Sequence, residues 1–405
     1  MRYCIAIPTF WTHPSGTGPG EIIYDHPTPL HTRGTLRRTL DSLSPLVSDA
    51  VQVVVVAAVT APQLEAPVAA QLQELIQSPP LPYPVVMFGG SQLRALQDIL
   101  HTRGQGHLAG LLSLSGYSQV RNLTLVLANI WAAEVLVSLD DDEIIADPHF
   151  LDKIAEDFAV LSQAHPIFGL AGIYQNRDGR VLVPEPTAPW TVYWPKIRWM
   201  NMAFKDLMLS GPRLKPTPLA LGGNLALSAR LFRQLPFDPA LTRGEDIDYV
   251  LNARLFKIPF FLDNTLAVIH LPPEKPHPDW LRLRQDLARF LYTRRKLREP
   301  APQPGLASIT AAELKPYPGN FLEDDLEDRA GHSHTLLALE YLAKGQPQAA
   351  LDTLENLALI QAASQPSSSV LATYVEMVSD WQKLQSWLAR PEVAVRARHA
   401  VEGQP

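Results

Sequence analysis

An apolar run that stops abruptly in three aspartates constrains the fold more than any other stretch of this chain. Residues 135–139 read Val-Leu-Val-Ser-Leu, and Asp140, Asp141 and Asp142 follow directly. A β-branched, apolar run of this kind predicts a buried strand whose carboxyl end carries the acidic cluster. In open α/β sheets, ligands collect at that end of the strands. Side chains alternate along an extended backbone, so Asp140 and Asp142 should point to one side and Asp141 to the other.

Two carboxylates that converge on one side of a strand repel each other unless a cation or a basic group lies between them. Hard oxygen ligands suit Mg²⁺ or Mn²⁺, so the cluster predicts a site for a metal and a diphosphate. The alternative is that the acidic run merely starts the next helix. Asp147 and Pro148 already suit that role, with Asp147 as N-cap and Pro148 at the first helical position.

The composition is that of a globular protein without a nucleic-acid surface. The chain has 405 residues, of which 46% are hydrophobic and 19% charged, so it can form one large α/β domain with a smaller appendage, or two domains. A formal net charge of −6 without a basic tract argues against nucleic-acid binding. The single cysteine, Cys4, cannot form an internal disulfide and is expected to pack in the core.

The apolar segments do not predict a signal peptide or a membrane span. The opening run at residues 2–8 is too short for a signal peptide. The longest weakly charged stretch, residues 123–139, contains Asn129 and Glu134 and divides into a helix and a strand. We therefore expect a cytoplasmic protein without a transmembrane segment. Peripheral contact with a membrane and self-association as a homo-oligomer are left open.

Strands and helices alternate along the first 270 residues, which predicts a doubly wound, mostly parallel sheet. The expected strands lie at residues 3–8, 51–59, 84–88, 135–139, 167–173 and 260–270, and the expected helices at 35–46, 66–77, 92–101, 119–133 and 150–164. Residues 1–298 should form the α/β domain, residues 299–333 a linker, and residues 334–405 a helical C-terminal region. The segment at residues 184–218, rich in proline, tryptophan and basic residues, is either a lid or acceptor-binding loop or an aromatic packing segment.

Five motifs occur in an order that resembles the GT-A glycosyltransferases, in particular family-2-like enzymes and retaining relatives such as the glucosyl-3-phosphoglycerate and mannosylglycerate synthases. They are Ile7-Pro8-Thr9, Arg121-Asn122, Asp140-Asp141-Asp142, Gly222-Gly223-Asn224 and Arg243-Gly244-Glu245-Asp246. The resemblance covers about residues 3–270. It implies a GT-A fold, which is a Rossmann-like mixed sheet flanked by helices, here with a helical C-terminal extension.

The resemblance also implies a metal-dependent hexosyltransferase that uses a UDP- or GDP-sugar donor with Mn²⁺ or Mg²⁺. The acceptor hydroxyl would belong to a small molecule, a glycan or a lipid-linked sugar. The matching metal positions are Asp140, Asp142 and His270; the alternative for His270 is a strand-end histidine bonded to backbone. The matching donor-binding positions are Pro8, Thr9, Phe10, Arg121, Asp140 and Asp141. Arg121 would contact the diphosphate or anchor the acidic loop.

The Glu245-Asp246 pair matches the catalytic position of the family, where an aspartate acts as general base on the acceptor hydroxyl in inverting enzymes. The alternative is that both acids simply favour the start of a helix. The matching acceptor-binding positions are Gly222, Gly223, Asn224 and Arg243. The two glycines permit close backbone approach to a ligand or a positive φ, and the alternative is a plain tight turn. Arg243 would bind an acceptor anion or pair with Glu245 or Asp248.

Two other functions compete with this interpretation. A sugar nucleotidyltransferase usually has a Gly-rich basic loop after its first strand, and the residues after Pro8 supply no such lysine or arginine. A catalytically inactive GT-A-like binding module would instead use the C-terminal helices to hold a protein partner. A Rossmann dehydrogenase is excluded because no Gly-x-Gly-x-x-Gly follows a strand.

The chain departs from the GT-A pattern in one respect. The second expected strand, residues 51–59, ends without the acidic residue that often contacts the nucleotide base in that family, so the identity of the base is left open.

Overall fold

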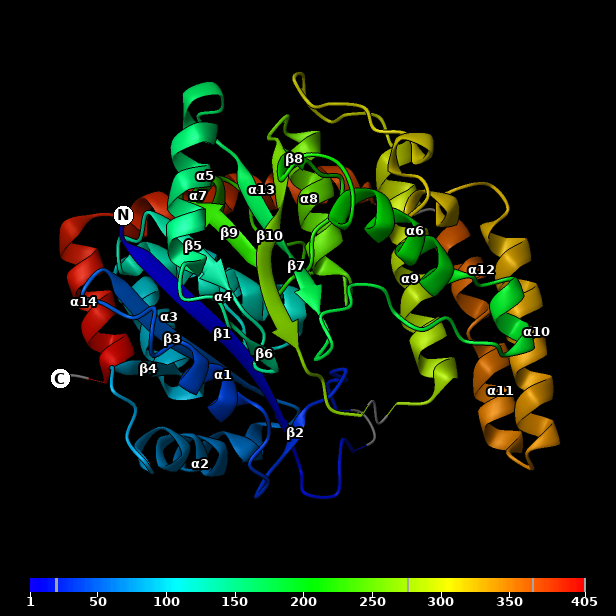
Figure 1. The fold of residues 1–405 in the computed structure, drawn as a ribbon, viewed down its shortest axis with the longest axis horizontal. Helices are drawn as coiled ribbons and strands as arrows, with labels where there is room; N and C mark the ends of the chain where they lie inside the picture. The colour runs from blue at the N-terminus through cyan, green and yellow to red at the C-terminus, as the bar shows by residue number, and fades with distance from the viewer. Residues whose placement is uncertain (19–20, 275–276, 366–367, 404–405) are drawn as a thin grey trace.

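A mixed β-sheet with helices on both faces forms the centre of the protein (Figure 1). The computed structural model describes residues 1–18, 21–274, 277–365 and 368–403. The predicted α/β class, with a helical C-terminus, is confirmed. From one edge to the other, the strands are β4 (Val85–Phe88), β3 (Val51–Val59), β1 (Tyr3–Thr12), β5 (Val135–Ser138), β9 (Leu225–Ser228), β7 (Gly169–Gln175), β10 (Phe260–His270) and β6 (Glu143–Ile144); β2 (Thr28–Pro29) pairs with β1, and β8 (Leu214–Pro216) with β10.

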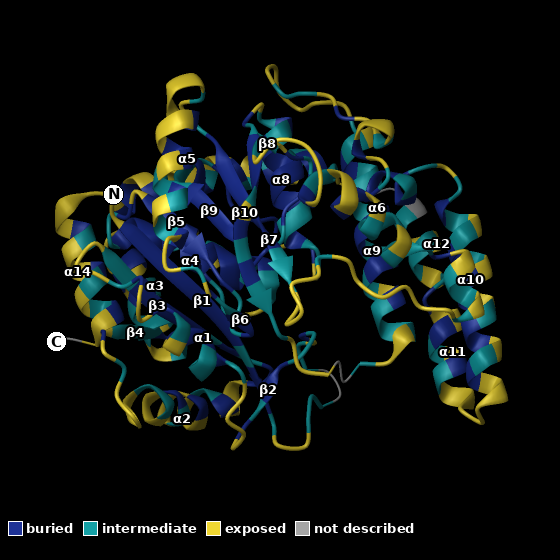
Figure 2. Ribbon diagram, viewed as in Figure 1, coloured by how far each residue is buried: buried dark blue, intermediate teal, exposed yellow. Residues whose placement is uncertain are grey.

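The central strands are apolar on both sides because each face of the sheet carries its own core. In β1, Cys4 and Ala6 belong to one core, and Ile5 and Ile7 belong to the other. This alternation follows from the two-residue repeat of a strand, and the burial of both faces explains the continuous valine run of β3. Figure 2 shows the sheet as buried and the outer helix faces as exposed.

The two cores define which helices cover which face. The face with Ile5 is covered by α1 (Leu36–Ser42), α2 (Glu65–Gln77) and α5 (Phe150–Ala164). The face with Cys4 is covered by α3 (Gly90–Thr102), α4 (Tyr117–Ile130), α7 (Ala229–Gln234), α8 (Glu245–Leu255), α13 (Val370–Leu388) and α14 (Pro391–Glu402).

The start of α5 corrects one prediction. The helix begins at Phe150 with His149 as N-cap, so the expectation that Asp147 caps it and Pro148 opens it is wrong. Asp147 instead forms a turn before the helix: its carboxylate accepts a hydrogen bond from the His149 backbone N–H at 2.9 Å and pairs with Lys153 at 2.6 Å. The acidic cluster at 140–142 therefore lies well before this helix and does not begin it.

The C-terminal helices fold back onto the α/β body. Helices α10 (Leu326–Ala343), α11 (Pro347–Glu355) and α12 (Ala358–Ser364) gather beside α9 (Asp279–Arg298) at one end of the molecule (Figure 1). From there α13 crosses to α4 and α7, where the Trp381 indole N–H donates to the Phe232 carbonyl at 3.0 Å. Because Trp381 is fully buried, α13 is part of the main core.

Between α9 and α10, the chain contributes buried side chains rather than an extended connection. Short 3₁₀ turns lie at Ala311–Leu314 and Gly319–Phe321, and Phe321 stacks on Phe290 with ring centroids 4.4 Å apart. Within the described ranges, no helix is both long and apolar enough to span a bilayer.

Candidate active site

A cavity of about 570 Å³ opens at the carboxyl ends of β1, β5, β7 and β10. These four strands run parallel to one another, so their carboxyl ends meet at one edge of the sheet, the usual ligand-binding edge of an α/β protein. Most of the predicted site residues line this cavity. They are Pro8, Phe10, Arg121, Asp140, Asp141, Asp142, Gly222, Arg243, Glu245, Asp246 and His270.

Arg121 ties together two acidic segments that are more than a hundred residues apart. From α4, its guanidinium donates to the Asp140 carboxylate at 2.8 Å and to the Glu245 carboxylate at 3.0 Å. A third N–H reaches the Ser138 hydroxyl at 2.8 Å. Burial alone would lower the pKa of Arg121, but Asp140 and Glu245 outweigh it and raise that pKa well above its usual value. Of the two roles predicted for Arg121, the structure contains the anchor of the acidic loop.

Removing this charge should destabilise the fold strongly. Replacing Arg121 by Met leaves the Asp140 and Glu245 carboxylates without their cation, which should cost about 3–5 kcal/mol of unfolding free energy. Replacement by Lys keeps the charge but loses the planar fork, so its cost should be intermediate. Urea denaturation of both variants measures the effect. A loss below about 0.5 kcal/mol for Arg121→Met would contradict this account.

Two histidines converge on one oxygen of Asp142. The Nε2 atom of His270 lies 3.4 Å from Asp142 Oδ2, and the Nε2 atom of His26 lies 3.6 Å from the same oxygen. Burial alone would raise the pKa of Asp142, but His270 and His26 outweigh it and hold that pKa below its usual value. His26 was missed at the sequence level. The only signal was the long polar loop between β1 and α1.

Strand pairing brings His270 to Asp142. The antiparallel pair β6 and β10 places His270 opposite Glu143, and the Leu271 backbone N–H donates to the Asp142 carbonyl at 2.9 Å. The sequence predicted that Asp142 and His270 each lie at the end of a strand, but it gave no information on how the two strands pair. The pairing fixes the histidine beside the acidic turn.

The surroundings of Asp142 suit a divalent cation as a partial ligand set. Its buried Oδ2 atom accepts no well-formed hydrogen bond from the described residues. Carboxylate oxygen and imidazole nitrogen are ligands that Mn²⁺ accepts. Within the described part of the chain, however, no three His, Cys, Asp or Glu side chains are arranged as a complete metal centre. Asp142 and His270 could therefore hold a cation whose remaining ligands come from a bound diphosphate, with His26 close by.

Asp141 has partners different from those of its neighbours. The Thr9 hydroxyl donates to its carboxylate at 2.6 Å, and the Thr39 hydroxyl donates to its carbonyl at 2.9 Å. Burial, with the nearby charges of Asp142 and Asp140, raises the pKa of Asp141 to about 8. Thr9 is fully buried and does not line the cavity; it braces Asp141 from β1.

Two side chains pack closely against the two glycines before β9. A Cβ on Gly222 would lie 2.6 Å from an Arg121 nitrogen, and one on Gly223 would lie 2.2 Å from a Glu143 oxygen. The tight turn is also present, since Gly222 and Gly223 lie in a turn in which the Asn224 backbone N–H donates to the Leu221 carbonyl at 3.0 Å. Neither glycine has a positive φ, and the predicted close approach to a ligand stays a prediction. Gly223 supports the cavity without lining it.

Asn224 and Glu143 also support the site from beneath. The Asn224 side-chain amide donates to the carbonyls of Ile173 and Leu266 at 3.1 and 2.9 Å, which ties β7 to β10, and Asn224 does not line the cavity. Glu143 is fully buried and accepts a hydrogen bond from the Asp140 backbone N–H at 2.9 Å. Burial, and then Asp140 and Asp142, raises the pKa of Glu143 well above its usual value. Glu143 was not among the predicted site residues.

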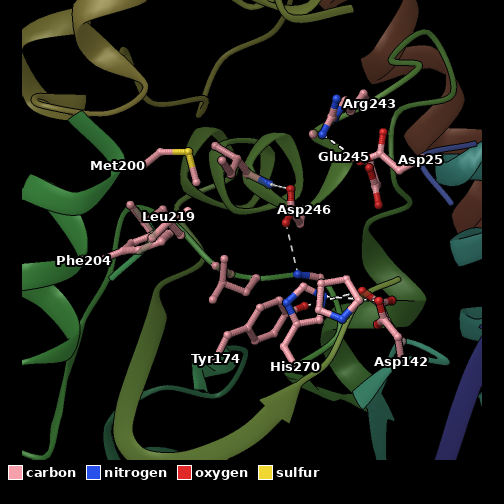
Figure 3. A pocket seen from close by; sticks show the side chains of 18 of the residues that line it. Asp25, Asp142, Tyr174, Met200, Phe204, Leu219, Arg243, Glu245, Asp246 and His270 are labelled. Carbon is pink, nitrogen blue, oxygen red and sulfur yellow. Dashed lines mark hydrogen bonds and ion pairs between the residues drawn. The ribbon is translucent and has the colours of Figure 1, made fainter. Parts of the chain in front are cut away.

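Asp246 faces the cavity from the first turn of α8 (Figure 3). Its carboxylate accepts hydrogen bonds from the backbone N–H groups of Gly222 at 3.1 Å and Ile247 at 2.8 Å, which fix its direction. Burial raises the pKa of Asp246, and the hydrogen bond from Ile247 and the nearby charge of Arg121 oppose the shift only in part. Glu245, by contrast, is held by Arg121.

Arg243 pairs with a residue that the sequence did not suggest. Its guanidinium lies 2.7 Å from the carboxylate of Asp25, a residue of the loop after β1. The predicted alternative, an ion pair with Glu245 or Asp248, is therefore wrong. Asp248 instead pairs with Lys296 at 2.8 Å in the core. The first turn of α8 directs Asp248 inward, whereas Arg243 and Asp25 both line the cavity.

Comparison with known proteins gives similarity only at the level of structure. No protein-family model and no curated protein matches the sequence. Similar solved structures include a mannosyltransferase from Pyrobaculum calidifontis in complex with GDP-Man and Mn²⁺, 14% identical over 100% of this chain and 88% of that one, with a TM-score of 0.41. Glucosyl-3-phosphoglycerate synthase from Mycobacterium tuberculosis, in complex with Mn²⁺, uridine diphosphate and phosphoglyceric acid, is 19% identical over 72% of this chain and 78% of its own, with a TM-score of 0.39. Residues 1–349 of S. aureus TarS are 13% identical over 93% of this chain and 92% of that one, with a TM-score of 0.41.

Proposed function

We propose that this protein is a metal-dependent glycosyltransferase that moves a hexose from a UDP- or GDP-sugar to an acceptor hydroxyl. One observation carries the proposal: a buried carboxylate flanked by two imidazoles, at Asp142, shares a cavity with a second, half-buried carboxylate, at Asp246. The first group suits a metal-bound diphosphate. The second suits a hydroxyl that must lose a proton.

In this proposal, Asp142 and His270 hold the Mn²⁺ or Mg²⁺ ion with the donor diphosphate. When bound, the cation neutralises the charge that develops on the departing nucleoside diphosphate. Asp140 also belongs to the proposed metal site. Its ion pair with Arg121 holds the acidic turn in place. Pro8 and Phe10, in the second half of β1, line the cavity and would contact the nucleotide.

Asp246 receives the acceptor. Its backbone hydrogen bonds hold the carboxylate toward the cavity, and an acceptor hydroxyl can donate to it there. The bond between the sugar C1 and the diphosphate oxygen breaks, a bond between C1 and the acceptor oxygen forms, and the hydroxyl proton passes to Asp246 in an inverting reaction. In a retaining reaction, the same carboxylate positions the hydroxyl.

Calorimetric titration of the full chain with UDP, GDP and their sugar conjugates, each with Mn²⁺ and with EDTA, tests the function. We expect binding of one nucleotide family only with metal. Absence of binding to every conjugate in the presence of Mn²⁺ would overturn the proposal.

A further inference from the structure

One side of the cavity is apolar, and it continues to the protein surface. On α6 (Lys196–Met208), four residues at positions i, i+3, i+7 and i+11 share one helix face. All four line the cavity, together with two leucines from the segment before β9. These lining residues, here called the apolar wall, are Ile197, Met200, Phe204, Met208, Leu219 and Leu221.

The apolar wall lies across Asp246 from the metal-binding side. Figure 3 shows Met200, Phe204 and Leu219 grouped together, with Asp246 between them and Asp142. A sugar, a diphosphate and a hydroxyl need polar partners, because a polar group buried without one costs free energy. The apolar wall supplies none of these partners. Its chemistry therefore suits a different part of a ligand.

Core packing alone does not account for this wall. Phe204 and Met208 are buried and belong to a further hydrophobic cluster that includes Phe290 of α9, but they also border the open cavity. Protein interiors are close-packed and have few voids larger than a water molecule. The lining also includes Leu182 and Val183, which are 37% and 41% exposed, so the apolar surface reaches solvent. A chain attached to a bound acceptor has an exit there.

Three cations near the wall take part in ion pairs, and two of them share one carboxylate. Lys196 lies 2.8 Å from Asp286, and Arg289 lies 2.9 Å from the same carboxylate. Arg243 is paired with Asp25. Because two cations share one carboxylate and Arg180 also lines the cavity, it is the apolar wall and not the ion pairs that favours an apolar ligand segment beside α6.

We propose that the acceptor is amphipathic, with a hydroxyl-bearing head at Asp246 and an apolar chain that runs along the apolar wall toward Leu182 and Val183. This inference rests on the proposed glycosyltransferase function, whose acceptor class it names. Each methylene buried against α6 should tighten binding about fourfold, which corresponds to about 0.8 kcal/mol.

Alkyl glucosides of different length test the proposal, because the head group stays constant while the chain grows. Methyl, hexyl and octyl β-glucoside would be titrated calorimetrically into the full chain below their micelle concentrations. We expect octyl glucoside to bind at least tenfold more tightly than methyl glucoside. Equal affinities for the three glucosides would overturn the proposal.

Two matched variants separate the wall from non-specific detergent binding. Met200→Gln, on the wall, should reduce the octyl advantage about tenfold, and Ile197→Gln serves as a second wall variant if Met200→Gln fails to fold. Val160→Gln should leave the affinity advantage of octyl over methyl glucoside unchanged, since Val160 is 57% exposed on α5 and does not line the cavity. An octyl advantage that survives both wall variants would also overturn the proposal. Failure of nucleotide binding, in contrast, is measured without glucosides and concerns the proposed function alone.

Discussion

Replacing Asp142 by Asn should lower the affinity for a nucleotide sugar in the presence of Mn²⁺ by about a hundredfold or more, a loss of at least about 2.7 kcal/mol. Asn keeps the size of the side chain but removes the negative charge that faces His270 and His26. A hard divalent cation binds a neutral amide oxygen much more weakly than a carboxylate. Calorimetric titration of wild type and variant with the same nucleotide sugar measures the difference.

The metal dependence of the two proteins provides the sharper comparison. EDTA should reduce the wild-type affinity to the level of Asp142→Asn, while it should change the variant little. Asp152→Asn is a matched control, because Asp152 has a side chain that is 73% exposed on α5. Wild-type affinity in Asp142→Asn would remove Asp142 from the metal site.

The elements of the fold that sequence could predict are those with a strong local pattern. The expected strands at β3 and β10 and the expected helix at α5 agree with the observed bounds. Each is a continuous apolar run or a regular helical repeat, so local spacing is enough to define it. The N-cap of α5 was wrong because Asp147 satisfies a turn instead, and such local competition between turn and cap is not visible in spacing.

The site could be predicted as a set of residues but not as a set of contacts. Most of the predicted site residues line the cavity, since the carboxyl ends of parallel strands meet at one edge, but much of the lining was not predicted. The partners of these residues come from distant segments: Glu245 for Arg121, Asp25 for Arg243, and His26 for Asp142. Strand register and loop closure bring these groups together, and neither follows from the spacing of one sequence.

Replacing Asp246 by Asn should lower the turnover number for glycosyl transfer about a thousandfold and leave donor affinity within about threefold of wild type. General-base catalysis is worth about 10²- to 10⁴-fold, and Asn cannot accept the hydroxyl proton. Its side-chain oxygen can still accept the hydrogen bond from Gly222, so the start of α8 should keep its geometry. Donor binding would be measured by calorimetry and transfer by product formation. Asp206→Asn, at an exposed position of α6, is the matched control.

The pH dependence distinguishes a base from a structural carboxylate. Burial raises the pKa of Asp246, so the fraction in the basic form falls as the pH is lowered through that raised value. The wild-type kcat/KM should therefore decline on the acidic side, beginning above the ordinary range of an aspartate. The residual activity of Asp246→Asn should lack this decline, because the group that titrates is gone. If the variant kept both wild-type turnover and the acidic limb, Asp246 would have no part in proton transfer, and the acceptor hydroxyl would need another base in the cavity.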